Sequence, residues 1–90
     1  MSQAVRYVLF YESGDLSLAV ENFPAHRARY EEFMSRGDLL SLGAFTDRKG
    51  SIAIFTSQKA AEDFASSDPF VLAGVVSEWH VREWNAASPD

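Results

Sequence analysis

VRYVLFY, residues 5–11, is the stretch that decides the fold. Most of its residues are β-branched or aromatic, so the stretch predicts a β-strand. Successive residues of a strand point to opposite faces of the sheet, and here both faces are largely apolar. A strand of this kind belongs in a sheet that is covered on both sides, which is unusual for a lone antiparallel sheet.

Three more strands are predicted further along the chain. Residues 39–45 and 51–56 have strand patterns and are joined by a polar turn at 46–50, so together they predict a β-hairpin. Residues 75–84 predict a last strand with one apolar face and one mixed face.

Helices are predicted between these strands. The segment 24–36 has a proline at its start and Gly37 just past its end, as helix termini prefer. Ser57 can cap a second helix at 58–66, and a short helical turn is expected at 68–72. The apolar face of the first helix consists of His26, Tyr30, Phe33 and Met34.

The connection before the first helix, residues 12–23, is long. Ser13-Gly14-Asp15 marks a turn at its start, and a helical turn fits around residues 16–20. Long loops often cover a ligand, so this segment is a candidate lid, although a plain surface loop explains it as well.

The predicted order is β-α-β-β-α-β, the ferredoxin-like arrangement on one antiparallel sheet with helices on one face. We therefore expect one α+β domain over residues 1–90, with a core at about 5–85 and a tail at 86–90. The sheet face without helices also carries apolar residues. We expect it to pack against the same face of a second copy, which predicts a homodimer.

The amino-acid composition limits the classes of partner and the cellular locations that we expect. Thirteen acidic residues against eight basic ones give a net charge of −5, which argues against nucleic acid as a partner. Cysteine is absent, so disulfides and thiolate nucleophiles are excluded and a reducing, cytoplasmic location is favoured. The apolar run near the N-terminus is short and contains Arg6, which argues against a signal peptide or a membrane span.

His26, His80 and Asp68 are the residues weighed for chemistry. A lone histidine on an apolar helix face is more often a hydrogen-bonded core residue than a catalyst, and His80, between Glu78 and Arg82, fits a solvated strand face. Asp68 precedes a proline and fits a helix N-cap. It could also accept a hydrogen bond from an imidazole, and the two roles can coexist.

Motifs for other chemistries are absent from the sequence. It has no glycine-rich phosphate loop, no HExxH motif and no nucleophile elbow around its serines. A metal site would require His26 and His80 to converge with a carboxylate, which a sequence cannot establish. We therefore predict neither a metal site nor a cofactor.

Segments spread over residues 5–85 resemble the YCII-related family, and the helix-borne histidine combined with an Asp-Pro-Phe segment is the most specific part of the resemblance. The matching segments are Tyr11-Glu12, Pro24 with His26 and Tyr30, Gly37-Asp38-Leu39-Leu40 with Gly43, Gly50-Ser51, residues 60–64, Asp68-Pro69-Phe70 and residues 73–76.

The resemblance implies a dimeric α+β barrel and a cleft in which His26 and Asp68 form a catalytic pair. It also implies chemistry on small molecules without a tightly held cofactor. The activities assigned in the family are eliminations or dehydrohalogenations of ring compounds, but many relatives have no assigned activity, so the family name does not decide the function.

Two main hypotheses follow. In the first, the protein is a lyase or dehydrohalogenase-like enzyme in which His26 is the general acid or base, Asp68 orients it, and Tyr7, Tyr30 and Phe70 line the substrate pocket unless they are simply core residues. In the second, the same cleft holds a small ligand without chemistry, as a binding or accessory dimeric domain. A structural partner domain and a haem-using protein are further alternatives, and the haem-using protein ranks last.

Overall fold

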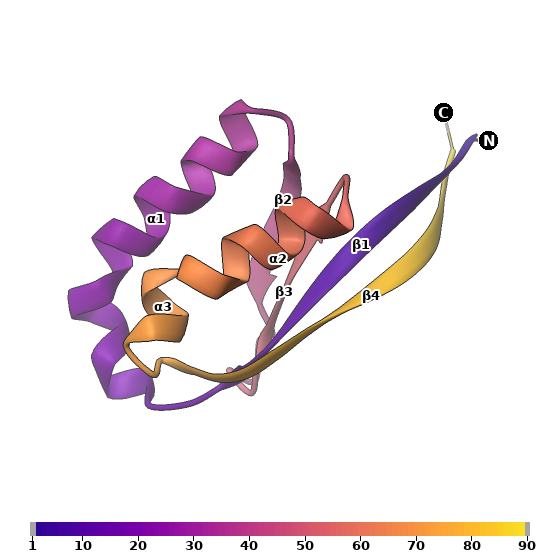
Figure 1. Cartoon of the computed structure of the whole chain (residues 1–90). Coiled ribbons are helices and arrows are strands. Elements are labelled where there is room, and N and C mark those ends of the chain that lie inside the picture. Colours follow the sequence, from indigo (N-terminus) through magenta and orange to yellow (C-terminus); the bar gives the residue numbers. More distant parts are fainter. Residues whose placement is uncertain (1, 90) are drawn as a thin grey trace.

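The computed structural model describes residues 2–89, which form a four-stranded antiparallel sheet with helices on one face. In the sheet the strand order is β2-β3-β1-β4 (Figure 1). The predicted α+β class and the β-α-β-β-α-β order are therefore confirmed. The elements along the chain are β1 (Ser2–Ser13), η1 (Leu16–Leu18), α1 (Ala19–Ser35), β2 (Leu39–Ala44), β3 (Ser51–Phe55), α2 (Gln58–Ser67), α3 (Pro69–Leu72) and β4 (Val76–Ser88).

Strands β1 and β4 form a long ribbon that extends past the helices (Figure 1). Their pairing runs from Ser2 opposite Ser88 to Ser13 opposite Val76, so the start of β1 and the end of β4 lie side by side. Both strands are longer than the predicted segments 5–11 and 75–84. Once the two strands are neighbours, residues 2–4 and 86–88 satisfy one another's backbone hydrogen bonds, whatever their side chains are.

Helix α1 begins at Ala19, so the predicted start at Pro24 is wrong. The start signal is Asp15, whose carboxylate accepts a hydrogen bond from the N–H of Ser17 and caps η1, which leads directly into α1. Pro24 is tolerated inside the helix because the carbonyl that loses its partner belongs to Val20, which is 87% exposed and near water. Much of the expected long loop at 12–23 is therefore helical.

A β-bulge in each of two strands changes which residues face the helices. Strict alternation would place Leu39 and Leu42 on opposite faces of β2, yet both pack on the core, because the register shifts between Leu39 and Ser41. In β4, Val76 and Trp79 both pack on the core as well, because the pairing with β1 shifts between Glu12 and Ser13. Simple alternation along the sequence therefore fails in both strands, because one inserted residue reverses the faces of the residues beyond it.

The core between the sheet and the helices is centred on three aromatic rings. Phe64 of α2 lies 5.2 Å from the ring of Phe33 on α1 and 5.4 Å from the ring of Phe55 on β3. Ala61 and Ala65 of α2 are fully buried, and their small side chains let this helix lie close to the sheet. Helix α2 is therefore held firmly, and the segment that follows it starts from a well-defined place.

Candidate functional site

Asp68 lies in the tight connection between α2 and α3. Its backbone is extended, as expected for a residue before proline, and its Oδ1 atom accepts a hydrogen bond of 3.1 Å from the N–H of Phe70. The predicted N-cap geometry is therefore present. The side chain is nevertheless fully buried, whereas helix caps usually lie at the surface, so capping alone does not account for its position.

His26 reaches Asp68 from α1. Its Nδ1 atom lies 2.7 Å from Oδ1 of Asp68, and the histidine is only 7% exposed. His26 lies about two turns into α1 instead of in the first turn, because the helix begins earlier than predicted. The structure thus brings the two predicted site residues into direct contact.

Tyr11 of β1 completes the group around the carboxylate. Its hydroxyl donates a hydrogen bond of 2.6 Å to Oδ2 of Asp68. Burial raises the pKa of Tyr11, and the negative charge of Asp68 raises it further, so the phenol stays protonated. Asp68 is therefore hydrogen-bonded to Tyr11, His26 and Phe70, so both of its carboxylate oxygens have partners in a buried site.

Aromatic side chains fix the plane of the His26 ring. The ring of Phe70 stacks on it with centroids 3.9 Å apart and an angle of 6° between the planes. Tyr30 presents its edge at 5.3 Å, and Phe64 lies at 6.3 Å. Because Asp68 holds one nitrogen and these rings hold the plane, the imidazole has one well-defined orientation.

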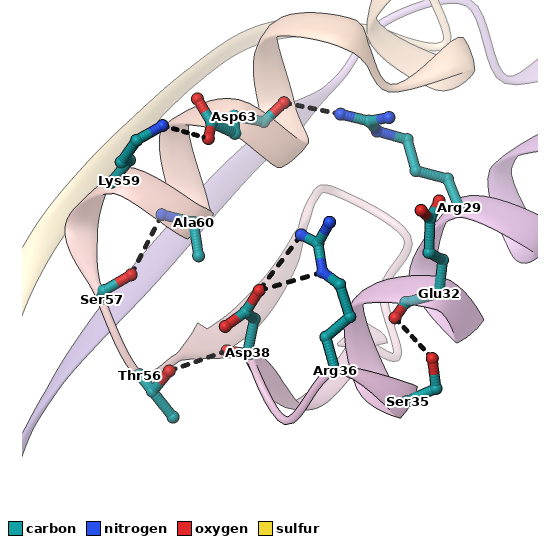
Figure 2. Close-up of polar contacts among 10 residues, drawn as sticks. All are labelled: Arg29, Glu32, Ser35, Arg36, Asp38, Thr56, Ser57, Lys59, Ala60 and Asp63. Atoms are coloured by element: carbon teal, nitrogen blue, oxygen red, sulfur yellow. Dashed lines mark hydrogen bonds and ion pairs between the residues drawn. The ribbon is translucent and has the colours of Figure 1, made fainter.

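Arg29 ties the two helices together beside this pair. Its guanidinium donates to the backbone carbonyl oxygens of Asp63 at 2.6 Å and Phe64 at 3.2 Å, and Figure 2 shows it reaching from α1 to Asp63 on α2. Arg29 is about one turn after His26, and Phe64 is about one turn before Asp68. This bridge therefore sets the distance between the helices at the place where the pair must meet.

A cavity of about 260 Å³ opens beside His26, between the sheet and α1. Among residues 2–89, no residue hydrogen-bonds Nε2 of His26, and no buried side-chain nitrogen or oxygen lacks a partner, so Nε2 is the accessible ring nitrogen. The lining residues are Leu9, Tyr11, Phe23, His26, Tyr30, Leu42, Gly43, Ala44, Ser51, Ile52, Ala53, Phe64 and Phe70.

Of the three residues predicted to line a pocket, Tyr30 and Phe70 border this cavity. Tyr7 does not. It lies earlier on β1 than Leu9 and Tyr11, where it packs against the core and its hydroxyl donates to Glu83 at 3.4 Å. The described lining residues include no lysine, arginine, aspartate or glutamate, so the cavity offers a ligand an apolar surface with the His26 imidazole and two phenols.

Sequence reasoning missed Tyr11 and Phe23 as members of the site. Tyr11 counted only toward the family resemblance, because a tyrosine on the inner face of a strand is normally a core residue. Phe23 fell in the expected loop. Its ring lies 6.2 Å from that of His26, at the edge of the cavity, and the continuous helix from Ala19 is what brings it there.

His80 lies on the opposite face of the sheet from Asp68, where it is exposed and stacks on Phe10 at 5.0 Å. Within the described chain there is no group of three or more histidine, cysteine, aspartate or glutamate side chains that could hold a metal ion. Nor is any helix among these residues long and apolar enough to cross a membrane.

Comparisons with known proteins agree with this fold. A family model described as YCII-related domain matches residues 5–85. A solved structure of 5-chloro-2-hydroxyhydroquinone dehydrochlorinase (TftG) from Burkholderia phenoliruptrix AC1100, in complex with 2,5-dihydroxybenzoquinone, superposes with a TM-score of 0.70 at 24% sequence identity. The alignment covers 88% of this chain and 92% of that one, and it establishes a shared fold. A comparison with curated proteins found no match.

Proposed function

On the premise that this chain belongs to the YCII-related domain family, we propose that it is a small-molecule enzyme in which His26 and Asp68 form the catalytic pair. The observation that carries the proposal is the 2.7 Å contact between Nδ1 of His26 and Oδ1 of Asp68, beside a cavity that the His26 side chain lines. An ionised Asp68 keeps the proton on Nδ1, so Nε2 has the lone pair that a general base needs.

The proposed reaction is the elimination of H–X from a ring compound. Nε2 of His26 takes a proton from the substrate, and the bonding pair left behind becomes the new double bond. The group X, a halide or a similar anion, leaves with the electron pair of its own bond. Asp68 stabilises the imidazolium that forms. A positioned general base of this kind accelerates a reaction by about 10² to 10⁴.

The size and polarity of the cavity support a substrate with one substituted ring and no fixed charge. A cavity of about 150 Å³ holds benzene in another protein, so 260 Å³ has room for one ring with several substituents. The described lining offers no cation for a carboxylate or phosphate. The structural neighbour is named as a dehydrochlorinase of a hydroxyhydroquinone, which supports halogenated hydroxyquinols as the first compounds to test.

Halide release from such compounds tests the proposal. We expect His26→Ala to lower kcat/KM by about a hundredfold or more, while Lys59→Ala, at an exposed position of α2 away from the cavity and the open sheet face, leaves it unchanged. Equal rates for the wild type and His26→Ala would refute the catalytic role.

The alternative is a domain that binds a ligand in the same cavity without chemistry. The apolar lining and the low polarity around His26 would serve that role equally well. It predicts that a ring compound changes the NMR resonances of the His26 imidazole while no halide or other product appears.

We also propose that the protein is a homodimer formed through the open face of its sheet. Leu9, Ala53 and Val81 point to the helices. The residues directly before and after each of them in its strand therefore point to the other face of the sheet. A groove on this face supports an apolar partner surface, and its lining residues are Val8, Phe10, Ile52, Ile54, Arg82, Glu83 and Trp84.

The charges on this open face support a second copy as the partner. Glu12 and Glu78 are directly opposite each other in the sheet and make one end acidic, whereas Arg6 and Arg82 lie toward the other end. In a two-fold dimer with antiparallel faces, the acidic end of one copy meets the basic end of the other. Light scattering after size exclusion tests the proposed dimer.

A cytoplasmic location is the last part of the proposal. A chain without cysteine and with small-molecule chemistry suits a reducing compartment. Fractionation of cells that express the full protein tests this location.

A further inference from the structure

We propose that Tyr11 is a positioning residue for His26 and that it acts through Asp68. This inference rests on the proposed function of the His26–Asp68 pair. The phenol of Tyr11 lines the same cavity as His26, and its hydroxyl donates to the carboxylate oxygen that His26 does not use. Tyr11, Asp68 and His26 thus form one hydrogen-bonded chain from the central sheet to the accessible Nε2 atom.

The first reason is geometric. Rotation of a carboxylate about its last side-chain bond is only weakly restricted. Oδ1 of Asp68 is bonded to His26 and to the N–H of Phe70, whereas Oδ2 is bonded to Tyr11 alone among the described residues. Holding both oxygens fixes the carboxylate plane, and this plane sets the direction in which the imidazole must point its Nδ1–H group.

The second reason is the location of the proton. Tyr11 is a buried phenol that stays protonated, so it acts on Asp68 only as a donor. Oδ2 of Asp68 is thus occupied by the Tyr11 hydroxyl, and Oδ1 is the oxygen that faces the imidazole. Asp68 can then hold the Nδ1–H group of His26 without taking its proton, which leaves the lone pair on Nε2.

The third reason is the support of Tyr11 itself. Its strand, β1, lies between β3 and β4, and Tyr11 is paired with Ser51 on one side and Trp79 on the other. Its side chain is 8% exposed and belongs to the hydrophobic core. A group on a central strand is held more rigidly than one on a loop, so it is a suitable anchor for a carboxylate in a turn.

The test compares Tyr11→Phe with Tyr30→Phe by ¹⁵N NMR of the histidine rings. Both variants remove one hydroxyl near His26, but only Tyr11 bonds Asp68. We expect the neutral His26 ring of the wild type and of Tyr30→Phe to have its proton on Nδ1. In Tyr11→Phe we expect a mixture of Nδ1–H and Nε2–H forms. We also expect kcat to fall by about ten- to a hundredfold with KM little changed, because a fold-change of this size corresponds to the loss of one hydrogen bond to a charged group.

A double variant excludes general repacking as the cause. If Tyr11 acts only through Asp68, then Tyr11→Phe in an Asp68→Asn background causes no further change in the His26 resonances. A further change of the same size in that background, or an unchanged tautomer in folded Tyr11→Phe, would overturn the inference. If Tyr11→Phe does not fold, the wild type provides the test. The buried O–H proton of Tyr11 should give a slowly exchanging resonance close in space to the Nδ1–H proton of His26. The absence of that resonance would contradict the contact.

These readouts separate the inference from the proposed function. The tautomer needs no substrate, so a response to Tyr11→Phe without any turnover by the wild type would support the positioning role and count against the enzyme. Turnover that depends on His26 but is unaffected by Tyr11→Phe would support the enzyme and overturn the role of Tyr11.

Discussion

Nδ1 of His26 lies 2.7 Å from Oδ1 of Asp68, although 42 positions separate these residues in the chain. His26 comes from the middle of α1, and Asp68 comes from the turn that joins α2 to α3. The contact therefore depends on the docking of both helices on one sheet. Changes to this pair, or to the groups that hold it, should affect stability as well as chemistry.

Asp68→Ala should cost more stability than the loss of a helix cap. It leaves donors on Tyr11, His26 and Phe70 without their acceptor in a buried site, and each unsatisfied donor costs about 1 to 3 kcal/mol. We expect a loss of about 3 kcal/mol or more in urea unfolding. Ser57→Ala, which removes the cap on the N–H of Ala60, should cost about 1 kcal/mol. Equal losses in the two variants would mean that Asp68 is only a cap.

Tyr11 should make the protein less stable in alkali. Its pKa is raised in the folded state, whereas an unfolded tyrosine ionises near pH 10, so the folded state binds more protons above that pH. The stabilisation is complete below about pH 10 and falls by about 1.4 kcal/mol per pH unit above it. Urea unfolding from about pH 9 to 11 should give a shallower decline for Tyr11→Phe than for the wild type. The same slope in both would show that the phenol ionises freely in the folded protein.

Arg29→Met should loosen the contact between α1 and α2. The substitution keeps an apolar stem over Phe33 and Phe64 but removes both hydrogen bonds to the α2 backbone. We expect a loss of about 1 to 3 kcal/mol and weaker protection of the His26 Nδ1–H proton from exchange. Arg27→Met, which removes only an exposed pair with Glu31, is the control and should change neither quantity.

A charge exchange on the open sheet face should test the proposed dimer. Glu78→Lys places a lysine opposite Glu12 and cancels the negative charge of the acidic end, so it should weaken self-association, more strongly at low salt. Adding Arg82→Glu in the same chain restores opposite charges across a two-fold axis and should recover the dimer. Lys59→Glu, on the exposed side of α2, is the control in sedimentation measurements. Failure of the double variant to recover association would contradict the antiparallel arrangement of the faces.

Part of this molecule could be predicted because the signals are local. The Ser57 cap, the Asp68-Pro69 turn and the short polar hairpin each depend on neighbouring residues, and all three lie where they were expected. The start of α1 was misplaced because Pro24 carries a stronger general signal than the Asp15 cap and the 3₁₀ turn that precede the helix.

For the candidate site, the sequence predicted some of the residues but none of the contacts between them. His26 and Asp68 were identified from residue type and family resemblance, but Tyr11 was not, since nothing near it in sequence indicates that its hydroxyl faces a carboxylate. Tyr7 and Tyr11 lie on the same face of one strand, and only the position of α3 over the sheet decides which of them reaches the site.

The sequence by itself determined the kinds of elements, their order and the two-sided apolar character of β1, because periodicity and capping act within a few residues. Only the tertiary structure decided that Tyr11, His26 and Asp68 meet, that bulges turn Leu42 and Trp79 to the core, and that the cavity carries no charged lining residue among those described. These features arise from pairing and packing between segments far apart in the chain, and no local pattern encodes the distance between them.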